Sequence, residues 1–216
     1  VQGPRQEDPR IALLQELGLP FLVHGRTGDA RGYNWLDIAN LRAFRRATEF
    51  LLDLGHSRIA LINGQEAMDF AARRRRGYEE ALRARSITPD ESLMYADVMT
   101  EGYGHRAAAQ LLDRENRPTA FLVSSVISAI GVRQAAWERG LQLGRDVSII
   151  THDDVLSYLN NDAEGPAFTA TRSSIRLAGR RCAEILIERI KQPDAPFVHE
   201  LWEAELMVGR STGPAP

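Results

Sequence analysis

The chain has 216 residues, of which 44% are hydrophobic and 26% are charged, and its formal net charge at pH 7 is −2. This composition excludes a largely disordered chain, because enough apolar surface is present to offset the entropy of ordering. No apolar run approaches the roughly 18 residues that a membrane helix needs, and the chain does not have the basic excess typical of a domain that binds duplex DNA by itself.

The first part of the chain predicts a helix, a strand and a second helix. The first helix is expected over residues 8–18, with Asp8 as its N-cap and Gly18 just beyond its last turn. An apolar strand is expected over residues 20–24. The second helix is expected over residues 40–54, where apolar side chains recur along one stripe.

Beyond residue 57 the pattern alternates regularly between strands and helices. The expected strands are 58–62, 93–98, 120–123, 146–150, 168–172 and 200–208, and the expected helices are 71–84, 104–114, 128–139 and 175–191. Strands that are apolar throughout and alternate with helices form mostly parallel sheets covered on both faces. The sequence therefore predicts an α/β fold with parallel sheets flanked by helices.

A ligand of such a fold binds at the carboxyl ends of the strands, where the loops gather. The chain has no dinucleotide-binding glycine fingerprint, no P-loop and no HExxH or CxxC motif, so we expect no cofactor and no metal site. The polar or small residues at the strand ends are His24-Gly25-Arg26, Asn63-Gly64-Gln65, Val98-Met99, Ser124-Ser125 and His152-Asp153-Asp154. These segments are the candidate ligand contacts.

A Ser-His-Asp hydrolase is the enzymatic interpretation of these strand ends. Neither Ser124 nor Ser125 lies in a G-x-S-x-G elbow. His152 and Asp153 are neighbours on an extended segment, so their side chains point to opposite faces and the aspartate cannot orient the imidazole. We therefore expect no catalytic residues and no enzyme activity.

Four stretches agree in order and spacing with one known family. They are residues 54–64 (LGHSRIALING), 74–82 (RRRGYEEAL), 146–154 (DVSIITHDD) and 171–179 (TRSSIRLAG). Together they resemble the effector-binding region of the lac-repressor/galactose-repressor family of bacterial transcription regulators, from about Asp8 to Thr212. The resemblance implies a two-lobe fold like that of the type I periplasmic binding proteins, with a small ligand between the lobes.

The resemblance also implies how the chain divides. The first lobe would take residues 1–55 and 171–198, and the second lobe residues 56–170 and 199–216. Family members carry a helix-turn-helix head ahead of this region. We expect this sequence to lack that head, together with the first two strand–helix units of the first lobe, which leaves the first lobe truncated.

Arg74 and Asp153 are the main ligand contacts that the resemblance implies. The guanidinium of Arg74 would reach into the cleft, where its fork of donors can bind two hydroxyl groups at once. Its alternative role is a solvated basic face, since residues 73–76 are all arginine. Asp153 would accept hydrogen bonds from ligand hydroxyls, and its alternative role is that of a cap or loop residue.

Three positions at the strand ends depart from the family pattern. His152 stands where most members have an aromatic residue, and it can still stack or donate. Ser125 and Val126 stand where most members have asparagine and aspartate. Because serine has a shorter reach than asparagine, we expect a ligand geometry that differs from that of simple galactosides. The alternative role of Ser125 is to cap the following helix.

The remaining candidates have weaker support. Asn40 matches a polar position at a helix start, where capping explains it equally well. Phe70 and Met99 match positions that pack against ligand rings, and both residues suit a hydrophobic core as well. Trp35 is an aromatic residue in a polar loop, expected as a stacking platform or a dimer contact.

The function implied by the resemblance is that of a cytoplasmic ligand sensor. Its effector would be a small molecule, by default a sugar, and we expect an α-glucoside-like disaccharide. Operator DNA would be bound only through the absent head. The protein would form a homodimer, with residues 40–54 and the segment after Asp154 as contributors. The single Cys182 allows no intrachain disulfide, in keeping with a reducing compartment.

The alternative function is that of a transport-linked solute-binding protein with the same fold. A secretory signal and a monomeric state would favour it. The start of the sequence, Val1-Gln2-Gly3-Pro4-Arg5-Gln6, does not have the shape of a signal peptide.

Overall fold

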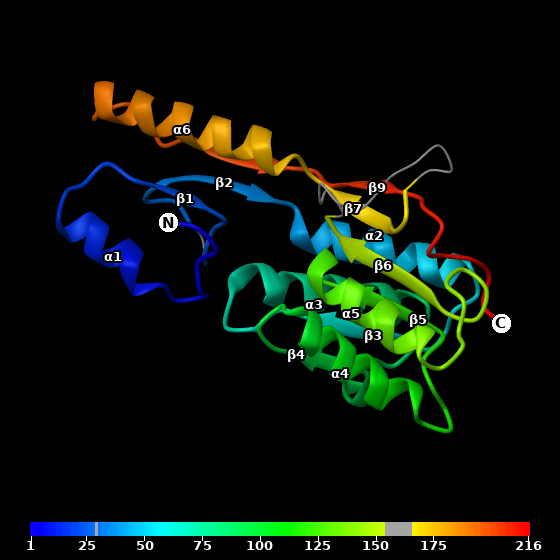
Figure 1. The fold of residues 1–216 in the computed structure, drawn as a ribbon. Helices are drawn as coiled ribbons and strands as arrows, with labels where there is room; N and C mark the ends of the chain where they lie inside the picture. The colour runs from blue at the N-terminus through cyan, green and yellow to red at the C-terminus, as the bar shows by residue number, and fades with distance from the viewer. Residues whose placement is uncertain (29, 154–165) are drawn as a thin grey trace.

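The structure is a computed structural model of the whole chain, and it describes residues 1–28, 30–153 and 166–216. The strands form two sheets (Figure 1). The smaller sheet is parallel and has the order β1 (Leu22–His24), β2 (Asn34–Ile38), β8 (His199–Trp202). The larger sheet has the order β4 (Met94–Ala96), β3 (Ile59–Asn63), β5 (Ala120–Val123), β6 (Ser148–His152), β7 (Thr169–Arg172), β9 (Glu205–Met207). Its strands pair in parallel except for β7 with β9, which confirms the predicted α/β class.

Helices cover both sheets. They are α1 (Pro9–Glu16), α2 (Asn40–Asp53), α3 (Asp69–Ala84), α4 (Glu101–Leu112), α5 (Val126–Trp137) and α6 (Ile175–Lys191), with the short 3-10 helix η1 (Glu91–Leu93) before β4. Asp8 caps α1 as expected, since its side chain accepts from the backbone N–H of Arg10. Within the described ranges, no helix is long and apolar enough to cross a membrane.

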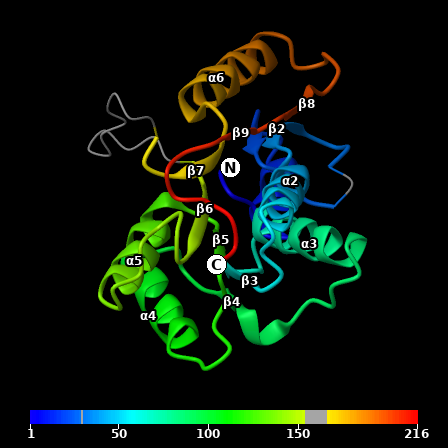
Figure 2. The same cartoon turned by 90° about the vertical axis from the view of Figure 1, so that its right-hand side faces the viewer.

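The larger sheet has a hydrophobic core on each face. Helices α2 and α3 cover one face, and α4 and α5 cover the other (Figure 2). Successive residues of β3 alternate between the two cores: Ile59 and Leu61 pack toward α2 and α3, and Ala60 and Ile62 toward α4 and α5. This alternation is the reason that the strand is apolar throughout, since successive side chains of a strand point to opposite faces.

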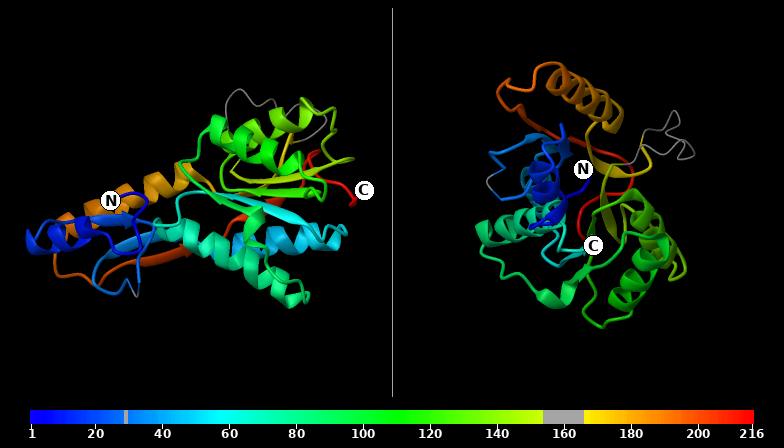
Figure 3. Two further views of the ribbon diagram at one scale, coloured as in Figure 1. Left: turned by 90° about the horizontal axis from the view of Figure 1, so that it is seen from below. Right: turned by 90° about the vertical axis from the view of Figure 1, so that its left-hand side faces the viewer.

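The smaller sheet extends to one side of the larger one (Figure 3). Helix α6 runs along it and α1 lies on its other side (Figure 1). The core under α1 is small, and its buried side chains are Ile11, Val23, Ala30, Tyr33 and Trp35. This core is the smallest of the three clusters of buried apolar side chains.

Three segments connect the two parts, and two of the sequence expectations are wrong at them. The sequence predicts a loop at β2, because Asn34 and Asp37 are polar. The structure shows a strand whose five residues are all buried. The single strand expected over residues 200–208 is two strands in different sheets, with the chain crossing at Glu203 and Ala204. The other crossings are between β2 and α2 and between β7 and α6.

The packing also shifts the expected lobe boundary. Helix α2 was expected with the first lobe, but Phe44 and Leu51 pack into the core of the larger sheet. Strand β8 was expected with the second lobe, but it pairs with β2 in the smaller sheet. Both differences arise because the chain passes between the two parts at the crossings before α2 and after β8. Helix α2 therefore belongs with the larger sheet and β8 with the smaller one. The dimer contribution expected after Asp154 falls on residues 154–165, which lie outside the described residues.

The tight crossing of α2 and α3 generates a stability prediction. A Cβ atom on Gly77 would lie 2.1 Å from the carbonyl oxygen of Leu41. We expect Gly77→Ala to lower the free energy of unfolding by about 1–3 kcal/mol, as overpacking does. The matched control is Gly179→Ala on α6, where nothing lies within 4 Å of the added atom. Urea denaturation should show no loss for this control, because alanine favours a helix over glycine. Equal losses in both variants would contradict the crossing geometry.

A buried histidine generates a pH prediction. His56 is 1% exposed, and its ring nitrogens lie 2.9 Å from the hydroxyl oxygens of Thr119 and Ser148. Burial lowers the pKa of His56 below 6.5, so the unfolded chain takes up the proton more readily than the folded chain. The stability that the neutral ring provides is therefore complete above about pH 6.5 and is lost as the pH falls through the folded-state pKa. Urea denaturation between pH 7.5 and 5 should show this decline, and His56→Gln should show a shallower one.

Candidate functional site

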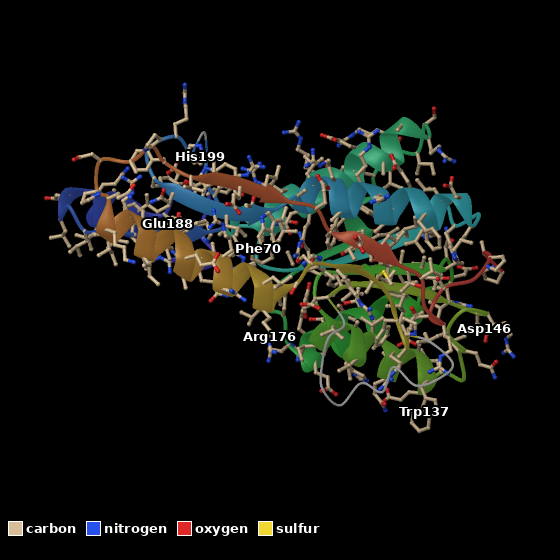
Figure 4. The ribbon with its side chains drawn as sticks, turned by 90° about the horizontal axis from the view of Figure 1, so that it is seen from above. Phe70, Trp137, Asp146, Arg176, Glu188 and His199 are labelled. Atoms are coloured by element: carbon tan, nitrogen blue, oxygen red, sulfur yellow. The ribbon has the colours of Figure 1, made fainter. Side chains whose placement is uncertain are left out.

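A cavity of about 440 Å³ lies between the two sheets, at the carboxyl ends of their parallel strands. This size is within the range of roughly 300–1,000 Å³ that small-molecule sites occupy. Its lining residues come from both parts and from the crossings: Gln2, Gly3, Pro4, His24, Gly25, Arg26, Asp37, Ile38, Asn40, Asp69, Phe70, Arg74, Met99, Ser124, Ser125, Val126, His152, Asp153, Ser173, Ile175 and Ala178. Figure 4 shows Phe70 near the junction of the two parts.

Seven of the eight residues expected as ligand contacts lie together in this lining. They are Asn40, Phe70, Arg74, Met99, Ser125, His152 and Asp153. They come from elements far apart in the sequence, and the parallel order of β3, β5 and β6 brings them to one edge of the larger sheet. Their joint placement gives the cavity donors, acceptors and apolar walls.

Arg74 is the most constrained of these residues. Its Nε donates to Oδ1 of Asn40 at 2.8 Å, and its Nη1 donates to the carbonyl oxygen of Ser124 at 2.7 Å. The guanidinium carbon lies 4.9 Å from the ring centre of Phe44 and 4.8 Å from that of Phe70. With rings against the cation on two sides, only the Nη edge is left for a ligand.

Two nearby carboxylates favour the protonated form of Arg74. Burial lowers the pKa of Arg74 to about 9, and the charges of Asp37 and Asp153 oppose that shift. The guanidinium therefore stays protonated at neutral pH. The basic-face alternative does not apply to Arg74, which is 5% exposed, whereas Arg76 on the same helix is exposed.

His152 and Asp153 form the wall at the end of β6. Nδ1 of His152 lies 2.8 Å from the hydroxyl oxygen of Thr171. Burial, together with the charge of Arg74, lowers the pKa of His152 well below 6.5, so the imidazole is neutral. Asp153 has a backbone φ of 56°, a left-handed conformation that non-glycine residues rarely adopt. Such strain is concentrated at functional sites.

For both Ser125 and Asn40 the alternative to a ligand contact was a helix cap, and the structure shows a cap only for Ser125. The hydroxyl of Ser125 accepts from the backbone N–H of Ser128 and caps α5, and the residue also lines the cavity. Asn40 makes no side-chain cap bond at the start of α2. Its amide instead accepts from Arg74 and donates to the carbonyl oxygen of Ile38 at 3.0 Å. Asn40 is therefore a positioning residue for Arg74 and for the crossing.

The expectation that Trp35 lies in a polar loop is wrong. It lies in β2, is 8% exposed, and is absent from the lining of the cavity. Its indole N–H donates to the carbonyl oxygen of Ala30 at 3.0 Å, and its ring stacks on His199 with 5.1 Å between ring centres. The side chain of Trp35 packs into the small core under α1.

The smaller sheet contributes a polar wall to the cavity that the sequence does not reveal. Arg26 follows β1, and its Nε donates to Oδ2 of Asp37 at 2.9 Å. Burial raises the pKa of Asp37, while Arg26 opposes that shift. Burial also lowers the pKa of His24, which lines the same wall. Arg26 was visible as a strand-end residue, but Asp37 had no signal because its strand was not predicted.

Two other kinds of site, a metal centre and a serine–histidine pair, are not formed by the residues that the structure describes. No group of three histidine, cysteine or acidic residues there could hold a metal ion. The hydroxyl of Ser125 bonds within its own helix start, and His152 bonds Thr171, so the two do not form a nucleophile–base pair. The arrangement suits binding of a polar organic molecule.

The comparisons with known proteins agree with this geometry. A family model described as a periplasmic binding protein-like domain matches residues 48–212. The HTH-type transcriptional regulator AglR of Rhizobium meliloti (strain 1021) is 46% identical over 214 residues, which cover 98% of this chain and 60% of that protein. The chain belongs to the lac-repressor/galactose-repressor family. It matches the effector-binding region and spans about 60% of the length of the curated relatives AglR and CelR.

Solved structures of family members share the fold. A structure of a transcriptional regulator CelR in complex with cellobiose has a TM-score of 0.87 and 30% identity, and the match covers 98% of this chain and 64% of that chain. A LacI-family regulatory protein from Chloroflexus aggregans has a TM-score of 0.86 and 30% identity, with 98% of this chain and 75% of that chain covered. These two regulators therefore share the two-part arrangement of this chain.

The burial of Arg74 generates a prediction that separates it from its neighbours. Arg74→Ala leaves the acceptors on Asn40 and Ser124 without their donor, and we expect the free energy of unfolding to fall by about 1–3 kcal/mol. Arg76→Ala, on the exposed side of the same helix and paired with Glu80, should change it by less than about 0.5 kcal/mol. Urea denaturation of both variants checks this, and equal stabilities would contradict the structural role of Arg74.

Proposed function

We propose that this chain is the ligand-sensing part of a bacterial transcriptional regulator and that it binds a small carbohydrate in the cavity between the two sheets. The observation that carries the proposal is the cavity itself. It combines the donor edge of Arg74 and the carboxylate of Asp153 with the apolar side chains of Phe70 and Met99. A sugar needs all three, because its hydroxyls donate and accept while its ring faces are apolar.

The relatives support the same class of ligand. AglR and CelR are transcriptional regulators, and the CelR structure holds cellobiose. Within the carbohydrates we propose an α-glucoside-like disaccharide. The serine at position 125 and the neutral His152 give this cavity a hydrogen-bonding pattern of its own, distinct from the asparagine–aspartate pair of most family members.

The regulatory step would follow from the three crossings. A ligand that contacts both walls binds the closed arrangement of the two parts more tightly, and this difference in affinity shifts the equilibrium between arrangements. A coupling of about 1–3 kcal/mol is typical of allosteric proteins. The shift would change operator binding by a helix-turn-helix head in a homodimer. Such a regulator would act in the cytoplasm and carry out no catalysis.

A calorimetric panel tests the proposal. We expect the purified protein to bind at least one of the α-glucosides maltose, sucrose and trehalose saturably and adenosine not at all. Asp153→Asn should weaken sugar binding about 10-fold or more, because the ligand hydroxyls lose a charged acceptor. This variant is matched to the backbone, since asparagine tolerates the left-handed conformation at position 153.

The control variant is Asp113→Asn, whose carboxylate is exposed and pairs with Arg139 away from the cavity. Its sugar affinity should equal that of the parent protein. Tight binding of adenosine with no response to any sugar would overturn the carbohydrate proposal. A sugar-bound protein whose full-length form binds no operator DNA would favour the transport-linked alternative.

A further inference from the structure

The cavity holds a second guanidinium group, that of Arg26, on the wall opposite the larger sheet. Its Nε donates to Asp37, and its guanidinium carbon lies 5.1 Å from the ring centre of Trp35. Among the residues that the structure describes, no protein group accepts from its Nη1 or Nη2. The side chain is 25% exposed and lines the cavity. Arg26 therefore presents two sets of unused donors from a position fixed by a carboxylate and a ring.

The two arginines of the cavity are joined by a chain of hydrogen bonds across the crossing between β2 and α2. Asp37 accepts from Arg26 through Oδ2, and its Oδ1 lies 3.5 Å from Nδ2 of Asn40. Oδ1 of Asn40 accepts from Nε of Arg74 at 2.8 Å. In both arginines the Nε side is bound to this chain, and Nη donors are left over. The chain therefore holds two donor forks on opposite walls of one cavity.

The charges of the cavity lining balance. Its charged residues are Arg26 and Arg74 against Asp37, Asp69 and Asp153, and Asp69 forms an ion pair with Arg73 of its own helix. Burial lowers the pKa of both His24 and His152, so neither adds positive charge. An anionic ligand such as a sugar phosphate would find no excess of positive charge. Two guanidinium forks with balanced charge suit neutral hydroxyl groups instead.

We propose that Arg26 is the residue that selects a two-ring neutral sugar: Arg74 binds the hydroxyls of one ring, and Arg26 binds the hydroxyls of the other. This inference rests on the proposed carbohydrate function and adds the assignment of the second ring to the wall of the smaller sheet. A single-ring sugar held by Arg74 does not need Arg26. The contribution of Arg26 therefore belongs to the disaccharide alone.

Calorimetry with maltose and methyl α-glucoside tests this assignment. In Arg26→Gln we expect maltose affinity to fall about 10- to 100-fold, as the loss of charged hydrogen bonds does, while methyl α-glucoside affinity changes less than about 2-fold. The control is Arg180→Gln, since Arg180 is exposed on α6 and pairs with Glu184. Both affinities should stay as in the parent protein.

A second variant covers the case in which Arg26→Gln fails to fold because Asp37 is left buried without its partner. The double variant Arg26→Gln/Asp37→Asn removes both charges together and should show the same selective loss of maltose binding. Equal losses for both sugars, or an unchanged preference for maltose, would overturn the assignment. So would a parent protein that binds glucose 6-phosphate more tightly than glucose. If the parent protein binds no sugar at all, the proposed function fails rather than the role of Arg26.

Discussion

The site depends on one buried cation. The guanidinium of Arg74 is removed from water, and burying a charge without partners is costly enough that it must be hydrogen-bonded and balanced. Asn40, the carbonyl oxygen of Ser124 and the rings of Phe44 and Phe70 supply those partners. The partners come from three elements: Asn40 and Phe44 lie on α2, Phe70 lies on α3, and Ser124 directly follows β5. Satisfying Arg74 therefore fixes how α2, α3 and β5 meet at the edge of the cavity.

The same requirement extends to the smaller sheet. Because the side-chain oxygen of Asn40 is occupied by Arg74, its Nδ2 is left to bond Ile38 and approach Asp37. Asp37 in turn holds Arg26. The crossing between β2 and α2 is thus a hydrogen-bonded connection rather than a free linker. A ligand between the walls would contact groups whose positions are already coupled to one another.

Much of the fold could be predicted from the sequence. The helix over residues 175–191 and the strand over residues 120–123 were predicted with their observed bounds, because apolar periodicity and caps are local signals. Strand β2 could not be predicted, since Asn34 and Asp37 are polar residues that become buried only through partners in other elements. The crossing at Glu203 and Ala204 likewise has no local signature, and it separates two strands that the sequence presents as one.

For the site, local sequence patterns predict the order of strands and helices and therefore which residues stand at the strand ends. Among them are Ser124, whose carbonyl oxygen accepts from Arg74, and the wall residues His152 and Asp153. Which of these polar groups face one another depends on the tertiary packing. Tertiary packing places Trp35 in a core. It makes Asn40, the first residue of α2, the hydrogen-bond partner of Arg74, and it brings Arg26 and Asp37 to the opposite wall. The physical reason is that strand and helix signals arise from neighbours in the chain, whereas the pairing of a buried charge is settled between elements, here 34 residues apart for Asn40 and Arg74.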